Sequence, residues 1–230
     1  MALCSEHFML ERALSDISIK MSFIRFWNFN GHGYGLNVQN LNWQDAKSNA
    51  LTNGGYLVEI NTADENIFLK EMLSQELTDL SNDNNFNYAD TGLTFRYQDT
   101  KALDGISGNA AYVWTGGTDE EVEGDWIWSN SKIPISINRA EWGSGDLGNE
   151  PDNTNGDQDS LAFGLETWPS GLAQSAGYGD YGEWNDINKS NLLFSIIEFD
   201  AEVDEVTGPV SLATSNTITY EQGGVYRLYN

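Results

Sequence analysis

The sequence predicts an α+β domain, and two observations carry this prediction. Helical signals occur in two segments of the first third of the chain, and the remainder contains short apolar runs separated by Gly-, Asn- and Asp-rich stretches. Two early helices followed by many short strands are typical of an α+β fold. The chain has 230 residues, of which 40% are hydrophobic, so it can build one sizeable core.

We divide the chain into three parts. Residues 1–22 form an N-terminal extension, residues 23–200 form the domain, and residues 201–230 form an acidic linker and a β-hairpin-like segment. The last assignment depends on the Thr-, Tyr- and Val-rich composition of residues 210–230, because such residues favour strands.

The domain is expected to open with a strand and turn over residues 23–38, where aromatic and polar residues alternate. Asn42 then caps a first helix that ends at Gly54-Gly55. One face of this helix carries its apolar residues, which are Trp43, Ala46, Ala50 and Leu51. A short apolar strand is predicted at residues 56–60.

A second helix is predicted to start at the capping box Thr62-x-x-Glu65. Its apolar stripe consists of Phe68, Leu69, Met72, Leu73 and Leu77. The Asn- and Asp-rich residues 81–109 are expected to form a long surface insertion. Further strands are predicted at residues 111–115, 126–128, 161–165 and 192–199, and the polar residues 137–185 are expected to contain functional loops.

Charge and composition exclude several classes of function. The chain has 35 acidic and 11 basic residues, and the resulting net charge of −24 repels nucleic acid and anionic membranes but attracts divalent cations. Solubility alone also accounts for many of these carboxylates. No apolar run reaches the length of a membrane span, and no secretory signal is recognisable. The single cysteine, Cys4, excludes an internal disulfide.

Oxygen-bearing side chains cluster in the second half of the sequence. The candidate metal ligands are Glu150, Asp152, Gln158, Asn185 and Asp186. Carboxylate and amide oxygens are the ligands that Ca²⁺ selects, and the cluster has no His or Cys for zinc, copper or iron. The proline at position 151 indicates a tight turn that directs neighbouring side chains to one point. The sequence therefore predicts a calcium site.

The order of these motifs resembles the C-type lectin domain over residues 23–200. The resemblance depends on Trp43-x-x-Ala46 with Gly54-Gly55-Tyr56-Leu57 and Glu65, on Val113-Trp114-Thr115-Gly116 with Glu123-Gly124-Asp125-Trp126-x-Trp128, on Glu150-Pro151-Asp152, and on Trp184-Asn185-Asp186. The Trp168-Pro169 run and Gly182-Glu183 before Trp184 resemble versions in bacterial surface proteins. Four positions that are cysteines in animal members fall on Ala50, Ser160, Lys189 and Ile197, which implies a disulfide-free version.

The resemblance implies a C-type lectin-like fold and a calcium-dependent carbohydrate-binding module for adhesion or surface recognition, located outside the cell or on a cell or virion surface. The implied sugar-binding residues are Glu150, Asp152, Asn185, Trp168, Tyr178 and Tyr181. An auxiliary metal site in some relatives matches Asp119, Glu123, Asn153 and Asp159. The family pattern Glu-Pro-Asn with a later Glu is replaced by Asp152 and Gln158, which keeps the charge and leaves the choice of sugar open.

The sequence also bears on two other classes of function, an enzyme and a structural or interaction module. Paired carboxylates can hydrolyse glycosides, but here they are assigned to the metal, and a formylglycine-generating family with a similar fold needs active-site cysteines that this chain lacks. We therefore expect no enzymatic activity. The alternative to a lectin is a calcium-stabilised structural or protein–protein interaction module, in which residues 210–230 mediate contact with a protein partner or a second copy.

Overall fold

The computed structural model describes residues 23–76, 86–87, 94–95, 97–105, 107–203, 217–220 and 226–229. The predicted extension (residues 1–22), Leu77 and most of the acidic linker lie outside these residues. Among the described residues, no helix has the length and apolar character needed to cross a membrane.

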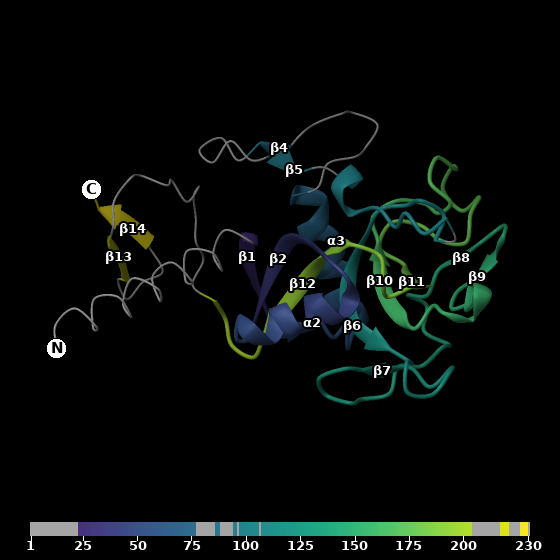
Figure 1. Ribbon diagram of the computed structural model, residues 1–230, viewed down its shortest axis with the longest axis horizontal. Coiled ribbons are helices and arrows are strands. Elements are labelled where there is room, and N and C mark those ends of the chain that lie inside the picture. Colours follow the sequence, from purple (N-terminus) through teal and green to yellow (C-terminus); the bar gives the residue numbers. More distant parts are fainter. Residues whose placement is uncertain are drawn as a thin grey trace.

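The domain is built on one sheet, in which the strand order is β1-β2-β12-β6-β10-β11 (Figure 1). The bounds of these strands are β1 (Phe23–Phe29), β2 (His32–Leu41), β12 (Leu193–Phe199), β6 (Tyr112–Thr118), β10 (Ser160–Gly164) and β11 (Trp184–Ile187). The short strands β3 (Tyr56–Leu57) and β7 (Ile127–Trp128) pair with β12 and β6. Strands β12 and β6 run parallel, and the other pairs are antiparallel.

The opening β1–β2 hairpin lies beside the closing strand β12. Strand β2 pairs with β12, and Gly35 lies opposite Ile197. The hairpin between β1 and β2 turns at Asn30 and Gly31, whose φ angles of 50° and 85° match the backbone twist of a tight hairpin. After β12, the chain is held by Asn28, whose side-chain amide donates to the Val203 carbonyl and accepts from the Val203 amide, each at 2.8 Å.

Helix α2 (Trp43–Thr52) follows the predicted cap, because Asn42 Oδ1 accepts a 2.8 Å hydrogen bond from the Asp45 amide. Its buried residues are Trp43, Ala46 and Ala50. The assignment of Leu51 to this face is wrong: its side chain is 58% exposed. One residue rotates a helix by about 100°, so the position after Ala50 turns away from the sheet.

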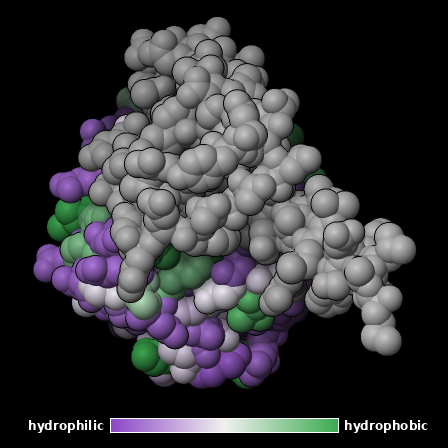
Figure 2. Space-filling model, turned by 90° about the vertical axis from the view of Figure 1, so that its left-hand side faces the viewer, coloured by the Kyte–Doolittle hydropathy of each residue, from purple (hydrophilic) through white to green (hydrophobic). Residues whose placement is uncertain are grey.

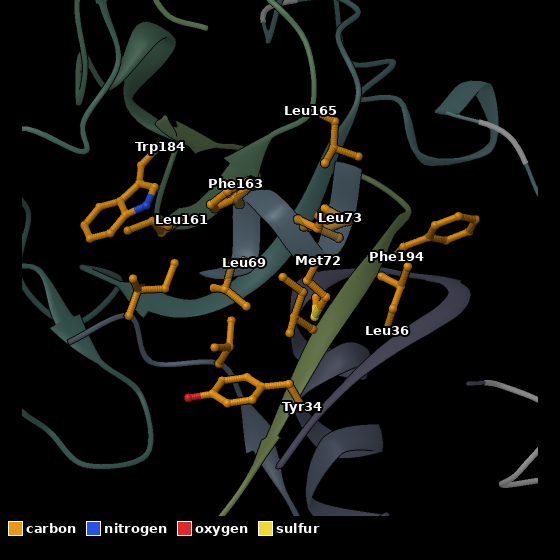
Figure 3. Packing of buried hydrophobic residues seen from close by; sticks show 14 of the residues in the cluster. Tyr34, Leu36, Leu69, Met72, Leu73, Leu161, Phe163, Leu165, Trp184 and Phe194 are labelled. Atoms are coloured by element: carbon orange, nitrogen blue, oxygen red, sulfur yellow. The ribbon is translucent and has the colours of Figure 1, made fainter. Parts of the chain in front are cut away.

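Helix α3 (Ala63–Glu76) begins at the predicted capping box. The Glu65 amide donates to Thr62 Oγ1 at 3.1 Å, and Glu65 Oε2 accepts from the Asn61 amide at 2.8 Å. In a standard capping box the glutamate side chain would accept from the Thr62 amide, whereas Glu65 accepts from the amide of the preceding residue, Asn61. Leu69, Met72 and Leu73 are buried against the sheet (Figure 3), which confirms the central part of the predicted stripe.

Two buried clusters stabilise the domain. The cluster under α3 joins Tyr34, Leu36, Phe163, Trp184 and Phe194 to the helix (Figure 3). The cluster under α2 contains both Ala50 and Ile197, the apolar pair expected at a disulfide position of animal relatives. These elements, with the paired ends of the domain, confirm the predicted α+β class and C-type lectin-like fold.

The end of the predicted surface insertion belongs to the core instead. Thr100, at the end of the 3₁₀ helix η2 (Tyr97–Thr100), is fully buried. Its hydroxyl donates to the Tyr112 carbonyl at 2.5 Å and accepts from the Phe194 amide at 2.9 Å. Ala102 is also buried. The sequence missed this because polar composition does not reveal a hydroxyl that bonds two strands. Farther upstream, β4 (Phe86–Asn87) pairs with β5 (Thr94–Phe95).

The loops between β7 and β11 extend at the end of the domain away from the β1–β2 hairpin (Figure 1). They contain β8 (Ser144–Gly145), β9 (Gly148–Asn149) and the 3₁₀ turn η3 (Thr154–Gly156). Near the C-terminus, β13 (Thr217–Tyr220) and β14 (Tyr226–Tyr229) form a separate antiparallel pair. The described surface seen in Figure 2 is mainly hydrophilic with scattered hydrophobic residues.

Candidate metal centre

Three carboxylates lie close together at the loop end of the domain. Glu150, Asp152 and Asp186 each offer an oxygen, and these oxygens all lie within 4.8 Å of one another. Glu150 follows β9 directly and precedes Pro151 through a cis peptide bond, and Asp186 lies in β11. Among the described residues, this is the one such group of His, Cys, Asp or Glu side chains.

Asp186 connects the strand to the loop that carries Asp152. Its Oδ1 accepts from the Asp152 amide at 3.1 Å, and its Oδ2 accepts from the Asn153 amide at 2.7 Å. The Asp152 side chain in turn accepts from the amide and hydroxyl of Thr154, at 3.0 and 2.7 Å. The fully buried strand residue therefore fixes the position of the exposed loop carboxylate.

Three further oxygens at this place are buried and have no hydrogen-bond partner: Glu150 Oε2, Gln158 Oε1 and Asn185 Oδ1. Their residues line one pocket of about 110 Å³, together with Asp152 and Tyr178. A buried acceptor without a donor costs about 1–3 kcal/mol. Three such acceptors around one small pocket fit a bound cation, which would satisfy all of them together.

The electrostatics of the pocket also fit a cation. Burial, together with the negative charge of Asp186, raises the pKa of Glu150 well above its ordinary value, and the Trp168 indole opposes this shift. Burial likewise raises the pKa of Asp186, against the effect of the Asn153 and Asp152 amides. Within the part of the chain that the structure describes, no Lys, Arg or His forms an ion pair with these carboxylates.

The donor set matches a hard cation. Glu150, Asp152 and Asp186 supply carboxylates, and Gln158 and Asn185 supply amide oxygens. Ca²⁺ takes six to eight oxygen ligands, so five side chains leave coordination positions for water or a ligand. The five residues that the sequence nominated therefore lie around one place, where their oxygens could hold a hard cation.

The aromatic residues predicted to stack on a sugar are placed differently. Trp168 is only 2% exposed, and its Nε1 donates to Glu150 Oε1 at 2.8 Å, so its ring faces are not available to a ligand. Tyr181 packs on the α3 cluster and donates to the Lys70 carbonyl at 2.5 Å. The burial of Trp168 leaves no room for a stacked sugar, and Tyr181 is partly buried against the α3 cluster and does not line the pocket, so the structure supports neither residue in a stacking role. Tyr178 is half-buried and lines the pocket.

Of the four residues of the predicted auxiliary metal site, Asp119 and Asp159 are neighbours, since the Asp119 amide donates to the Asp159 carbonyl at 3.4 Å. The Asn153 side chain lies at the Glu150 site instead, where its Oδ1 accepts from the Gln158 amide at 3.2 Å. Burial raises the pKa of Asp119 to about 6, against the Gly124 amide, and the negative charges of Glu123 and Asp159 add to the shift. These three carboxylates do not form a close group like that of Glu150.

A lysine lies at this second acidic region. Lys189 Nζ is 3.4 Å from Asp159 Oδ2 and 2.6 Å from Glu120 Oε1. Its ammonium group therefore supplies positive charge to one of the carboxylates that an auxiliary metal would need.

Sequence reasoning missed two residues of the site. The Thr154 hydroxyl donates to Asp152, two residues earlier in the chain. An Asp side chain commonly bonds a residue two positions later in a turn, so this contact could have been predicted from the sequence. Tyr112, whose hydroxyl accepts from Asn185 Nδ2 at 2.9 Å, gave no signal, because its place in β6 reads as an ordinary core position.

Comparison with known proteins identifies several similar chains. No family model matches the sequence. A perlucin-like protein of Mytilus galloprovincialis is 26% identical over 114 residues, which make up 50% of each chain. This chain therefore matches about half the length of that curated relative.

Among solved structures, the mouse scavenger receptor C-type lectin carbohydrate-recognition domain has a TM-score of 0.48 at 20% identity, covering 77% of this chain and 96% of its own. Human lithostathine has a TM-score of 0.47 at 16% identity, covering 76% and 95%. The C-type lectin CEL-I of Cucumaria echinata has a TM-score of 0.46 at 17% identity, covering 75% and 93%. Such low identities transfer no ligand to this chain.

Proposed function

We propose that the protein is a calcium-dependent carbohydrate-binding module that acts in adhesion or surface recognition. One observation carries the proposal: three partnerless buried oxygens belong to residues that line one pocket, Glu150, Gln158 and Asn185. Carboxylate oxygens of Asp152 and Asp186 lie within 4.8 Å of an oxygen of Glu150. The motif resemblance to the C-type lectin domain supports carbohydrate as the ligand class. The proposal includes no catalytic step and places the protein outside the cell or on a cell or virion surface.

Binding would use the coordination positions that the protein leaves free. Two adjacent hydroxyls of a sugar can replace the waters of a calcium ion held by Glu150, Asp152, Gln158, Asn185 and Asp186. Asp152 is exposed, so its carboxylate can also accept from a hydroxyl. The half-buried ring of Tyr178 is the remaining candidate for contact with the sugar.

The strongly acidic composition restricts the ligand. A net charge of −24 repels anionic glycans, so neutral glycans are the proposed partners. A pocket of about 110 Å³ buries only part of one sugar, so the affinity for a monosaccharide should be weak. Several copies on one surface would then supply the avidity.

A glycan array tests this function directly. The array is probed with multimerised protein in calcium, and again after chelation with EGTA. We expect binding to neutral glycans that disappears with chelator and in an Asp186→Asn variant. A folded, calcium-binding protein that binds no glycan would contradict the carbohydrate ligand.

The alternative of a protein-interaction module has its own supporting observation. Strands β13 and β14 pair with each other and, among the described strands, with no other. A two-stranded sheet keeps open edges, which can accept a further strand from a protein partner or a second copy. Removing residues 204–230 and measuring the molar mass by light scattering tests this. A decrease in oligomeric state would favour assembly through the hairpin.

A further inference from the structure

Two residues outside the donor set touch two of its members through single hydrogen bonds. Trp168 Nε1 donates to Glu150 Oε1 at 2.8 Å, and Asn185 Nδ2 donates to the Tyr112 hydroxyl at 2.9 Å. In both cases the second polar atom of the bonded side chain, Glu150 Oε2 or Asn185 Oδ1, is an oxygen that is buried without a partner. We propose that Trp168 and Tyr112 are positioning residues, which fix these two side chains so that their free oxygens face the cation pocket.

The bond to Tyr112 determines which way the Asn185 amide points. The Tyr112 hydroxyl donates its one proton to the Ser107 carbonyl at 3.0 Å. It can therefore only accept from Asn185, and only the NH₂ group of the amide can donate to it. The amide oxygen must then lie on the opposite side. A chain of two hydrogen bonds from a backbone carbonyl thus fixes the orientation that metal binding requires.

Trp168 is held equally firmly. Its amide donates to the Gly179 carbonyl at 3.1 Å, and its carbonyl accepts from the Tyr178 amide at 2.8 Å. The indole lies where Gly143, Gly164 and Gly179 leave room for it, because a Cβ atom at any of these positions would overlap the ring. Glycines from three separate segments therefore form the space that the Trp168 side chain fills. Because the ring is enclosed on these sides, the indole N–H points in one fixed direction.

The two positioning residues support each other. The rings of Tyr112 and Trp168 pack with centroids 5.6 Å apart at an angle of 60°, and both side chains lie in the buried cluster under α2. The indole N–H of Trp168 and the hydroxyl of Tyr112 each bond a proposed metal ligand that lines the same pocket. Partners of metal ligands commonly change metal affinity by about 10–100-fold when they are removed.

This inference rests on the proposed cation site, and conservative variants test it. Trp168→Phe keeps an aromatic ring but removes the N–H, and Tyr112→Phe removes one oxygen atom. Matched controls are Trp43→Phe, which removes an indole bond of 2.9 Å to the Thr115 carbonyl, and Tyr34→Phe, which removes a hydroxyl bond of 2.8 Å to Glu65. Both control residues are buried, and these bonds involve none of the five proposed metal ligands.

Calcium affinity is measured by isothermal titration of each full-length variant, and the melting temperature is measured in EGTA. We expect Trp168→Phe and Tyr112→Phe each to weaken calcium binding about 10–100-fold. In EGTA, the two control variants should lower the melting temperature by about as much as Trp168→Phe and Tyr112→Phe do. Their calcium affinity should stay within about twofold of that of the unmodified protein. If Trp168→Phe does not fold, Tyr112→Phe with Tyr34→Phe still decides the question.

Three results would overturn the positioning role. Unchanged calcium affinity in Trp168→Phe and Tyr112→Phe would reject it while leaving the proposed function intact. Equal losses of affinity in the two controls would assign the effect to general packing. Absence of calcium binding by the unmodified protein would reject the proposed cation site itself, and the positioning role with it.

Discussion

His32 Nδ1 lies 2.8 Å from Glu198 Oε1, at the start of β2 and near the end of β12. The side chain of Glu198 is 3% exposed, whereas that of His32 is 41% exposed. The Tyr56 hydroxyl donates to the same carboxylate oxygen at 3.0 Å, and the Glu59 amide donates to the other oxygen at 3.0 Å. This acidic side chain is therefore buried in the sheet, in contact with a histidine that solvent can reach.

The position of Glu198 predicts a pH-dependent stability. Burial raises its pKa to about 7, against the Glu59 amide, with further elevation by Glu65 and opposing effects of Tyr56 and His32. Because the folded state holds this proton more tightly than the unfolded chain, the associated stability is complete below about pH 4.5 and is lost as pH rises through about 7. We expect the melting temperature of Glu198→Gln to vary less between pH 5 and 8 than that of the unmodified protein.

Differential scanning fluorimetry over this pH range, in saturating calcium, measures the difference between the two slopes. The slope is the relevant quantity because a glutamine also changes the local hydrogen bonds and shifts the melting temperature at every pH. Two parallel curves would show that Glu198 does not titrate in this window.

Calcium should stabilise the folded protein. A ligand that binds only the folded state adds about 2.7 kcal/mol to the free energy of unfolding at 100 times its dissociation constant. Chelation with EGTA should therefore lower the melting temperature, since it leaves the carboxylates of Glu150, Asp152 and Asp186 without a counter-charge. Asp186→Asn should abolish the calcium-dependent increase, and Asp119→Asn should keep most of it. Equal responses of the two variants would contradict the assignment of the principal site.

Asn185→Asp should separate sugar binding from calcium binding. The variant keeps an oxygen for the metal but removes the NH₂ group, which donates to Tyr112 and has a second hydrogen for a ligand. We expect glycan binding at saturating calcium to fall by at least about tenfold, the equivalent of one hydrogen bond of about 1.4 kcal/mol. Calcium affinity should change less, because the negative charge added beside the cation offsets the loss of the bond to Tyr112. Titration with calcium and a glycan-binding assay on the same preparation give both values.

Thr100→Val should destabilise the fold without affecting the metal site. The variant keeps the shape of the side chain but leaves the Phe194 amide and the Tyr112 carbonyl without their hydroxyl partner. We expect a loss of about 1–3 kcal/mol in the free energy of unfolding, measured by urea denaturation. Leu103→Ala is the control, because that side chain is 75% exposed and its truncation should change stability by less than about 0.5 kcal/mol. Similar losses in both variants would contradict a specific role for Thr100.

Local signals gave the helix starts, because a cap involves residues that are close in sequence. The bonds of Asn42 to Asp45 and of Thr62 to Glu65 span three residues each. The donor set could also be nominated, since residue type and motif order indicate hard-cation ligands. Leu51 was misplaced because an apolar residue at the edge of a helical stripe can face either the core or solvent.

The mistaken role of Trp168 has a different cause. Its burial depends on three glycines, Gly164, Gly179 and Gly143, which lie 4, 11 and 25 residues away along the chain. Neither spacing nor composition indicates that these glycines meet around one indole. The role of Tyr112 was invisible for the same reason, since its partner Asn185 is 73 residues distant. Contacts of this kind follow only from the assembled sheet.

The paired hydrogen bonds between Asn28 and Val203 attach the chain that leaves β12 to the turn end of the β1–β2 hairpin. Because the pocket lies among the loops at the other end, whatever precedes residue 23 and follows residue 203 attaches at the pole opposite the ligand (Figure 1). A fusion tag or immobilisation anchor placed on either flank would leave the binding pole facing solution, which makes surface-tethered assays suitable for this protein.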